Sequence, residues 1–104
     1  LSSNTMQAVT LSGADAGALN GDGNGMVYDP LQDAFLLRKP EAGNAVYRIN
    51  AGTLAVDRMP SRSTGTQIPS AINGVWTRFL YVPALKGVVY FPAYSGNMWF
   101  QRTN

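Results

Sequence analysis

The side chains that could carry out acid–base or nucleophilic chemistry are few in this sequence. It contains no histidine and no cysteine, which excludes a Ser-His-Asp triad, a thiol nucleophile and metal sites built from imidazole or thiolate. Catalysis would depend on six carboxylates: Asp15, Asp22, Asp29, Asp33, Glu41 and Asp57. We therefore expect that the chain is not an enzyme by itself and needs no cofactor.

One glycine-rich segment, 20–25, has the spacing of a metal-binding loop. It places Asn20, Asp22 and Asn24 at alternate positions before a glycine, as at the start of a calcium loop. The position where such a loop needs a bidentate glutamate is Leu31. We therefore favour a sharp glycine-rich turn between strands, with no metal, and keep the three residues as a calcium alternative.

A second candidate site consists of aromatic and basic residues in the second half of the chain. Aromatic rings can lie against the apolar face of a sugar, while a few polar groups bind its hydroxyls. The candidate ligand-binding residues are Trp76, Arg78, Tyr94 and Trp99. The alternative is that the aromatic side chains pack between layers of the fold.

Charge is sparse and unevenly distributed. Charged residues make up 13% of the chain, about half of the usual share. Up to Asp57 six acidic residues outnumber three basic ones, and from Arg58 onward there are five basic residues and no acid. Chance is one explanation; the other is that an acidic part docks beside a basic part, because opposite fields favour association and set its register. The basic residues form no cluster, so we expect no nucleic-acid binding.

Short strands separated by turn residues are expected along most of the chain. Alternating or continuous apolar runs predict strands at 5–11, 26–29, 34–38, 45–50 and 54–58, then two strands within 78–92 and one at 98–102. Proline, glycine and asparagine occupy the intervening turns. No apolar run reaches the length of a membrane span, and no secretory signal pattern begins the chain.

The chain repeats itself at an interval of 53 residues without a gap. Tyr28 matches Tyr81 and Pro30 matches Pro83, and further identical pairs lie on either side. At the same interval Trp99 has Val46 as its counterpart, which favours packing for Trp99, whereas Trp76 has Gly23, so no shared core role is required of it. Units of about 50 residues with four strands are typical of β-propeller blades.

We predict an all-β fold of two four-stranded antiparallel propeller blades. Blade 1 covers 20–58 and blade 2 covers 73–103, and the second has only three predicted strands of its own. The strand at 5–11 is an outer strand that either completes blade 2 or belongs to a preceding blade. Together they form one domain over 1–104.

The motifs that carry a family resemblance are Tyr28-Asp29-Pro30 and the stretch from Arg78 to Tyr90, which reads RFLYVPALKGVVY. They resemble bacterial Kelch-like propeller repeats related to the central domain of galactose oxidase. The resemblance implies a propeller fold and leaves the function open. The copper ligands of the oxidase need residue types that this chain lacks, so its activity is not implied.

Two classes of function follow. The first is a non-catalytic binding module, with carbohydrate as a candidate ligand, in which three copies form a six-bladed ring, as in two-bladed lectins. The second is a structural part of a larger Kelch-like protein that supplies the remaining blades and the activity. We expect no membrane partner, and the low charge and polar loops slightly favour an extracellular or cell-surface location.

Overall fold

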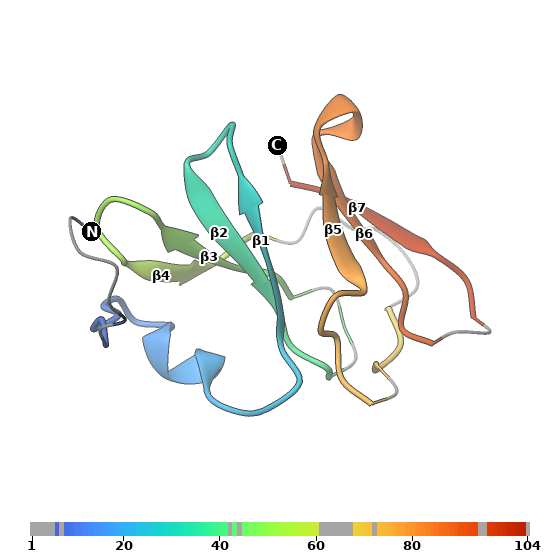
Figure 1. The fold of residues 1–104 in the computed structure, drawn as a ribbon, viewed down its shortest axis with the longest axis horizontal. Helices are drawn as coiled ribbons and strands as arrows, with labels where there is room; N and C mark the ends of the chain where they lie inside the picture. The colour runs from blue at the N-terminus through green and yellow to red at the C-terminus, as the bar shows by residue number, and fades with distance from the viewer. Residues whose placement is uncertain are drawn as a thin grey trace.

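The protein consists of two antiparallel β-sheets in a computed structural model that describes residues 6, 8–41, 43, 45–60, 68–71, 73–93 and 96–103. The first sheet has four strands in chain order, β1 (Gly25–Asp29), β2 (Ala34–Arg38), β3 (Tyr47–Asn50) and β4 (Val56–Arg58). The second sheet has three, β5 (Phe79–Val82), β6 (Gly87–Tyr90) and β7 (Trp99–Arg102). Two 3-10 helices, η1 (Ala16–Leu19) and η2 (Pro83–Leu85), precede β1 and β6 (Figure 1).

The two sheets lie next to each other through their first strands. Figure 1 shows β1 and β5 at the centre, with the remaining strands of each sheet extending away from this junction. Both sheets are meanders in which each strand pairs with the next along the chain. The all-β, antiparallel part of the sequence prediction is therefore confirmed.

Turn chemistry explains where the strands of the first sheet end. A side-chain oxygen of Asp29 accepts a hydrogen bond from the backbone N–H of Leu31 (2.9 Å), which starts the turn after β1. Asn50 does the same after β3, where its Oδ1 accepts bonds from the N–H groups of Gly52 and Thr53, both at 2.9 Å. Such Asx turns reverse the chain within a few residues.

The repeat is also present in the backbone. Val27 pairs with Leu36 in the first sheet and Leu80 pairs with Val89 in the second, each 53 residues later. The residue before the second strand of each sheet is left-handed, at φ 48° in Asp33 and φ 53° in its counterpart Lys86. The two β-hairpins therefore share their register and a left-handed residue before the second strand.

The third strand of the second sheet departs from the repeat by one residue. Leu37 pairs with Tyr47, whereas Tyr90, the counterpart of Leu37, pairs with Trp99. The paired residues Tyr90 and Trp99 are one position closer in the sequence than Leu37 and Tyr47, so Trp99 takes the place of Tyr47 in the sheet and not that of Val46. A shift by one residue reverses the face to which each side chain points.

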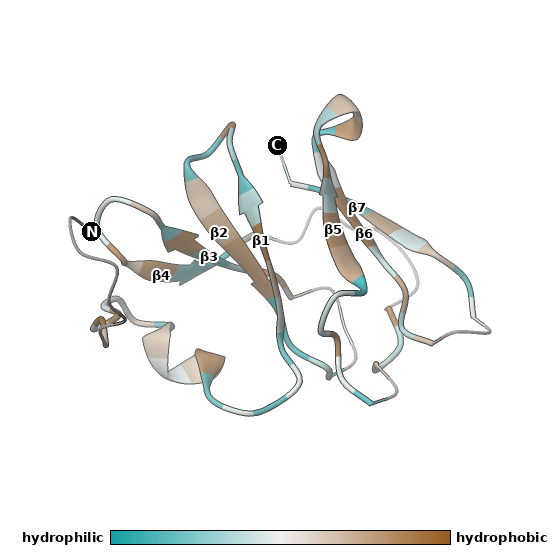
Figure 2. Ribbon diagram, viewed as in Figure 1, coloured by the Kyte–Doolittle hydropathy of each residue, from teal (hydrophilic) through white to brown (hydrophobic). Residues whose placement is uncertain are grey.

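The main core lies between the two sheets. Leu36 and Val46 from the first sheet pack with Phe79, Val88 and Tyr90 from the second, together with residues of the segment that joins them. Figure 2 shows the apolar residues concentrated along β2 and β5. Burial of these side chains is what holds the sheets together, at roughly 1.5–3 kcal/mol for each large apolar side chain.

A second apolar cluster lies on the other face of the first sheet. It contains Leu37, Ile49 and Val56, and the segment before β1 covers it with Leu11 and Leu19 among others. This cover leaves the β1 side of the same face open, where Met26 and Tyr28 are 56% and 46% exposed. The first sheet is thus buried on one face and half covered on the other.

The expected strand at 5–11 is not present in the part of that segment that the structure describes, Met6 and 8–11. The chain instead meets the first sheet at Ser12, which forms an isolated parallel bridge with Ala55 beside β4. Ser12 N donates to Leu54 O (3.1 Å), and Val56 N donates to Ser12 O (2.8 Å). Leu11, which is partly buried, packs against the first sheet, so the described part of this segment lies beside that sheet.

Candidate functional site

Trp76 is the predicted ligand residue with the clearest access to solvent. It lies in the turn before β5, is 59% exposed and has a left-handed backbone at φ 47°. Its indole N–H donates to the carbonyl oxygen of Asn73 at 2.6 Å. Since the polar atom is already bound, Trp76 can offer a ligand an apolar face but not a hydrogen bond.

Arg78 has a structural position close to Trp76. Its guanidinium donates through Nη1 to Pro92 O (3.0 Å) and through Nη2 to Gly74 O. It therefore ties the turn before β5 to the end of β6. The structure brings Trp76 and Arg78 together around Gly74, but Arg78 there holds the backbone that carries the tryptophan.

Trp99, another of the predicted ligand residues, does not extend this site. Trp99 is half-buried in β7 and packs against the core between the sheets, as the packing alternative predicted. Tyr94 lies outside the described residues. Among the residues that the structure describes, the candidate site therefore consists of one exposed aromatic ring with a supported turn beneath it.

The glycine-rich segment 20–25 owes its composition to a close approach of two backbones. Gly23 O accepts a hydrogen bond from Val75 N (2.6 Å), and a Cβ on Gly23 would lie 3.0 Å from the Cα of Gly74. A Cβ on Gly25 would lie 2.4 Å from Val75 Cγ1. The separation at Gly25 is too short for a side chain and the one at Gly23 is tight, so these glycines permit the first sheet to contact the turn before β5.

The calcium alternative gains no support from the geometry of the same segment. Asn24 donates its amide to Leu19 O (3.1 Å) and Gly21 O (3.3 Å), and Asp22 is exposed. Calcium requires six or more oxygen ligands. Within the described ranges no group of three or more acidic residues could hold a metal ion.

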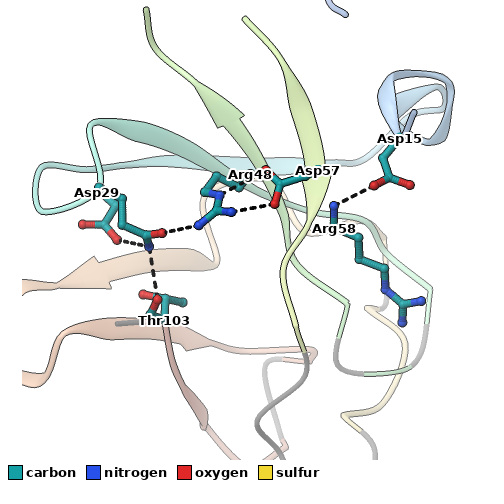
Figure 3. Close-up of polar contacts among 7 residues, drawn as sticks. Asp15, Asp29, Arg48, Asp57, Arg58 and Thr103 are labelled. Carbon is teal, nitrogen blue, oxygen red and sulfur yellow. Dashed lines mark hydrogen bonds and ion pairs between the residues drawn. The ribbon is translucent and has the colours of Figure 1, made fainter. Parts of the chain in front are cut away.

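A polar network that the sequence did not predict joins the sheets near the β1–β2 turn (Figure 3). Gln32 Nε2 donates to Asp29 Oδ2 (2.8 Å) and to Thr103 O (3.1 Å), while Gln32 Oε1 accepts from Arg48 Nη1 (2.8 Å). Arg48 also makes a two-point contact with Asp57, at 3.1 and 2.6 Å. Gln32 thereby connects the first sheet to the residue after β7.

The charges of this network hold strands together and are paired with each other. Hydrogen bonds to Asp57 raise the pKa of Arg48, so its guanidinium stays charged. Both partners remain partly exposed, and such ion pairs contribute at most about 1 kcal/mol. A cavity of about 300 Å³ adjoins the network, but the side chains of Gln32 and Arg48 that line it are already bound to protein groups.

Arg38 is the largest charged side chain in the interior. It is 1% exposed, donates from Nη2 to Gly43 O (2.8 Å), and its guanidinium carbon lies 4.2 Å from the centre of the Tyr90 ring. A cation over an aromatic face is stabilised by the ring quadrupole, more strongly when water is excluded. Arg38 therefore fastens the end of β2 to β6 across the two sheets.

Comparisons with protein-family models, curated proteins and solved structures found no match for this chain. The described part of the chain contains no helix with the length and apolar character needed to cross a membrane. The Kelch-like resemblance and the function it implies therefore remain predictions.

One polar contact on the open part of the first sheet gives a testable pH dependence. The Tyr28 hydroxyl donates to Asp33 Oδ1 at 2.6 Å, and this hydrogen bond, together with the nearby negative charge, raises the pKa of Tyr28 above its ordinary 10.0. Because the folded-state pKa is the higher one, the contact stabilises the fold below the unfolded-state value. That contribution is lost as pH rises through the folded-state pKa.

We expect Asp33→Asn to lower the pKa of Tyr28 toward 10.0, because the substitution removes the charge. Asparagine also tolerates the left-handed backbone of this position, so the turn should persist. Absorbance of tyrosinate during alkaline titration measures the difference between the two proteins. Tyr28→Phe, which removes the group, should abolish that difference, and identical curves for wild type and Asp33→Asn would contradict the assignment.

Proposed function

We propose that this chain is a non-catalytic sector of a β-propeller that works as part of a ring. The observation that carries the proposal is the arrangement of the two meanders, which lie side by side through their first strands β1 and β5. Propeller blades are four-stranded meanders packed around a central axis. The interval of 53 residues and the shared hairpin register further support two copies of one unit.

A non-catalytic role agrees with how the carboxylates are used. Asp29, Asp33 and Asp57 accept side-chain or backbone hydrogen bonds within the first sheet, and Asp15 accepts the N–H of Arg58 at 2.8 Å. These acids end turns and join strands, and the sequence has no histidine or cysteine to add to them. General acid–base chemistry needs a group placed in reach of a substrate, whereas these four carboxylates are engaged by groups of the protein itself.

Two sheets alone do not close a ring, so further blades must come from elsewhere. In the first version of the proposal three copies of the chain form six blades; in the second the chain is part of a larger Kelch-like protein that supplies the rest. Light scattering after gel filtration distinguishes them. A mass of three times 11.2 kDa supports the homotrimer, and a stable monomer at every concentration contradicts it and favours the larger parent.

A carbohydrate ligand is the second part of the proposal, and it is supported by Trp76 alone. The ring is 59% exposed and its orientation is held by the bond to Asn73. A rigid aromatic face suits the CH groups of a pyranose. Glycan-array binding that Trp76→Ala removes and Leu31→Ala leaves unchanged would support it, since both are exposed side chains. Absence of binding by the assembled protein would contradict it.

A further inference from the structure

One face of the second sheet is apolar and uncovered. Leu80 lies opposite Val89, which lies opposite Phe100, so the three side chains share a face, and Met98 continues it two residues before Phe100. Leu80, Met98 and Phe100 are 51%, 59% and 46% exposed. We call Leu80, Val89, Met98 and Phe100 the open face. Apolar patches of this kind on a soluble protein commonly mark an interface.

The first sheet has a matching uncovered area. Met26 and Tyr28 in β1 and Phe35 in β2 point to the face opposite the core, because Tyr28 pairs with Phe35 and Met26 lies two residues before Tyr28. Met26 and Tyr28 are about half exposed, and the segment before β1 covers only the more distant strands of this face. We call Met26, Tyr28 and Phe35 the β1–β2 face.

The contact already present within the chain indicates how these two surfaces fit. At the junction between the sheets, Val27 and Leu36 pack with Phe79 and Val88. The counterparts of Val27 and Leu36, 53 residues later, are Leu80 and Val89 of the open face. The counterparts of Phe79 and Val88, 53 residues earlier, are Met26 and Phe35 of the β1–β2 face.

The residues buried at the existing junction thus have exposed or half-buried counterparts on the two outer faces of the pair of sheets. Leu36 is 0% exposed and Phe79 is 1% exposed, whereas Leu80 and Met26 are 51% and 56% exposed. Apolar residues of the segment before each sheet pack beside that sheet: Ile68 and Ala71 lie in the core next to the second sheet, and Leu11 and Leu19 lie on the first. The open face and the β1–β2 face therefore have the residue positions needed to form the same contact between two copies.

Charge favours the same arrangement. The left-handed turn residue is Asp33 in the first sheet and Lys86 in the second. When the open face of one copy packs on the β1–β2 face of another, the Lys86 turn comes beside the Asp33 turn. The acidic first part of the chain then meets the basic second part, and opposite charges favour this pairing over contact of like halves.

We propose that the open face of one copy binds the β1–β2 face of a second copy, head to tail, in the geometry of the junction between the two sheets. This inference rests on the proposed assembly of copies and names the surfaces that carry it. Such a contact is heterologous, so each copy uses both surfaces. Contacts of this kind form a ring when the rotation from copy to copy completes one turn, as three copies with six blades require.

Charged substitutions at the two surfaces test the proposal. Leu80→Asp should remove the open face as a partner, Met26→Asp should remove the β1–β2 face, and each variant alone should be a monomer by analytical ultracentrifugation. Mixed in equal amounts they should form a dimer of one copy of each, because one intact surface remains on each partner. Circular dichroism checks that both variants fold, as expected for exposed positions.

A matched control carries the same substitution at an exposed apolar residue that lies outside both surfaces and outside the two turns. Val9→Asp, at a position that is 58% exposed, should keep the wild-type mass. If wild type and Leu80→Asp formed the same oligomer, the proposed surfaces would be wrong, although the assembly of copies would still hold. A mixture of Leu80→Asp and Met26→Asp that stays monomeric would overturn the head-to-tail contact. A wild-type monomer at all concentrations would overturn the assembly of copies and this contact with it.

Discussion

Phe79→Ala is expected to lower the free energy of unfolding by about 3–5 kcal/mol. Phe79 is 1% exposed and belongs to the core that joins the two sheets. Removing the ring takes away its burial and leaves a cavity that the surrounding strands cannot fill completely. Since small domains have only about 5–15 kcal/mol of stability, the variant should unfold at a much lower urea concentration.

Urea denaturation followed by tryptophan fluorescence measures this change. Leu85→Ala is the matched control, because Leu85 is an apolar residue of the same hairpin but is 54% exposed and should change stability by less than about 1 kcal/mol. If the two variants unfolded at the same urea concentration, the result would contradict the placement of Phe79 in a core that holds the two sheets together.

Gly25→Ala is expected to destabilise the protein by about 2–3 kcal/mol, even though alanine is only one methyl group larger. A Cβ at this position would lie 2.4 Å from Val75 Cγ1, 2.7 Å from Trp76 O and 3.2 Å from Phe79 Cβ. The second of these atoms belongs to the backbone, which moves less easily than the end of a side chain. The methyl group would therefore push β1 away from the turn before β5.

Gly17→Ala provides the control for this glycine. No atom lies within 4 Å of a Cβ placed at Gly17, and its backbone is not left-handed. We expect no loss of stability there, because alanine also restricts the unfolded chain more than glycine does. Thermal unfolding of both variants gives the comparison, and equal melting temperatures for the two would contradict the close approach of β1 to residues 75–79.

The clash that Gly25→Ala would create also involves Trp76, the candidate ligand residue. Trp76 O is one of the atoms that Gly25 approaches, and the Trp76 ring lies against Gly74. Displacing β1 would therefore disturb the turn that orients the indole. We expect Gly25→Ala to weaken any binding that depends on Trp76, in addition to its effect on stability.

The approximate strand positions and the antiparallel arrangement were predictable from the sequence, because both depend on local signals. Proline, glycine and asparagine in the turns, the apolar runs between them and the interval from Tyr28 to Tyr81 indicate two related meanders. The surroundings of the candidate ligand residues could not be read from the sequence. Trp76 is exposed as a ligand residue requires, whereas Arg78 binds backbone carbonyls and Trp99 packs, half-buried, against the core.

The contacts that join the sheets could not be predicted, since they link residues far apart in the chain. Gln32 is an ordinary turn residue in the sequence, and only the fold places it within hydrogen-bonding distance of Thr103. Arg38 similarly meets the Tyr90 ring only because β2 and β6 face each other. No periodicity or spacing carries a signal for such pairs.

By itself, the sequence determined that the protein is built from two copies of an antiparallel β unit with few groups for catalysis. Turns and strands are specified by neighbouring residues, so these features do not depend on distant contacts. Only the tertiary structure decided that residues 8–12 pass beside the first sheet, that the glycines of 20–25 permit a close approach, and that the outer face of the second sheet stays open. These features depend on which apolar surfaces become buried against each other, and this is determined only when the sheets pack.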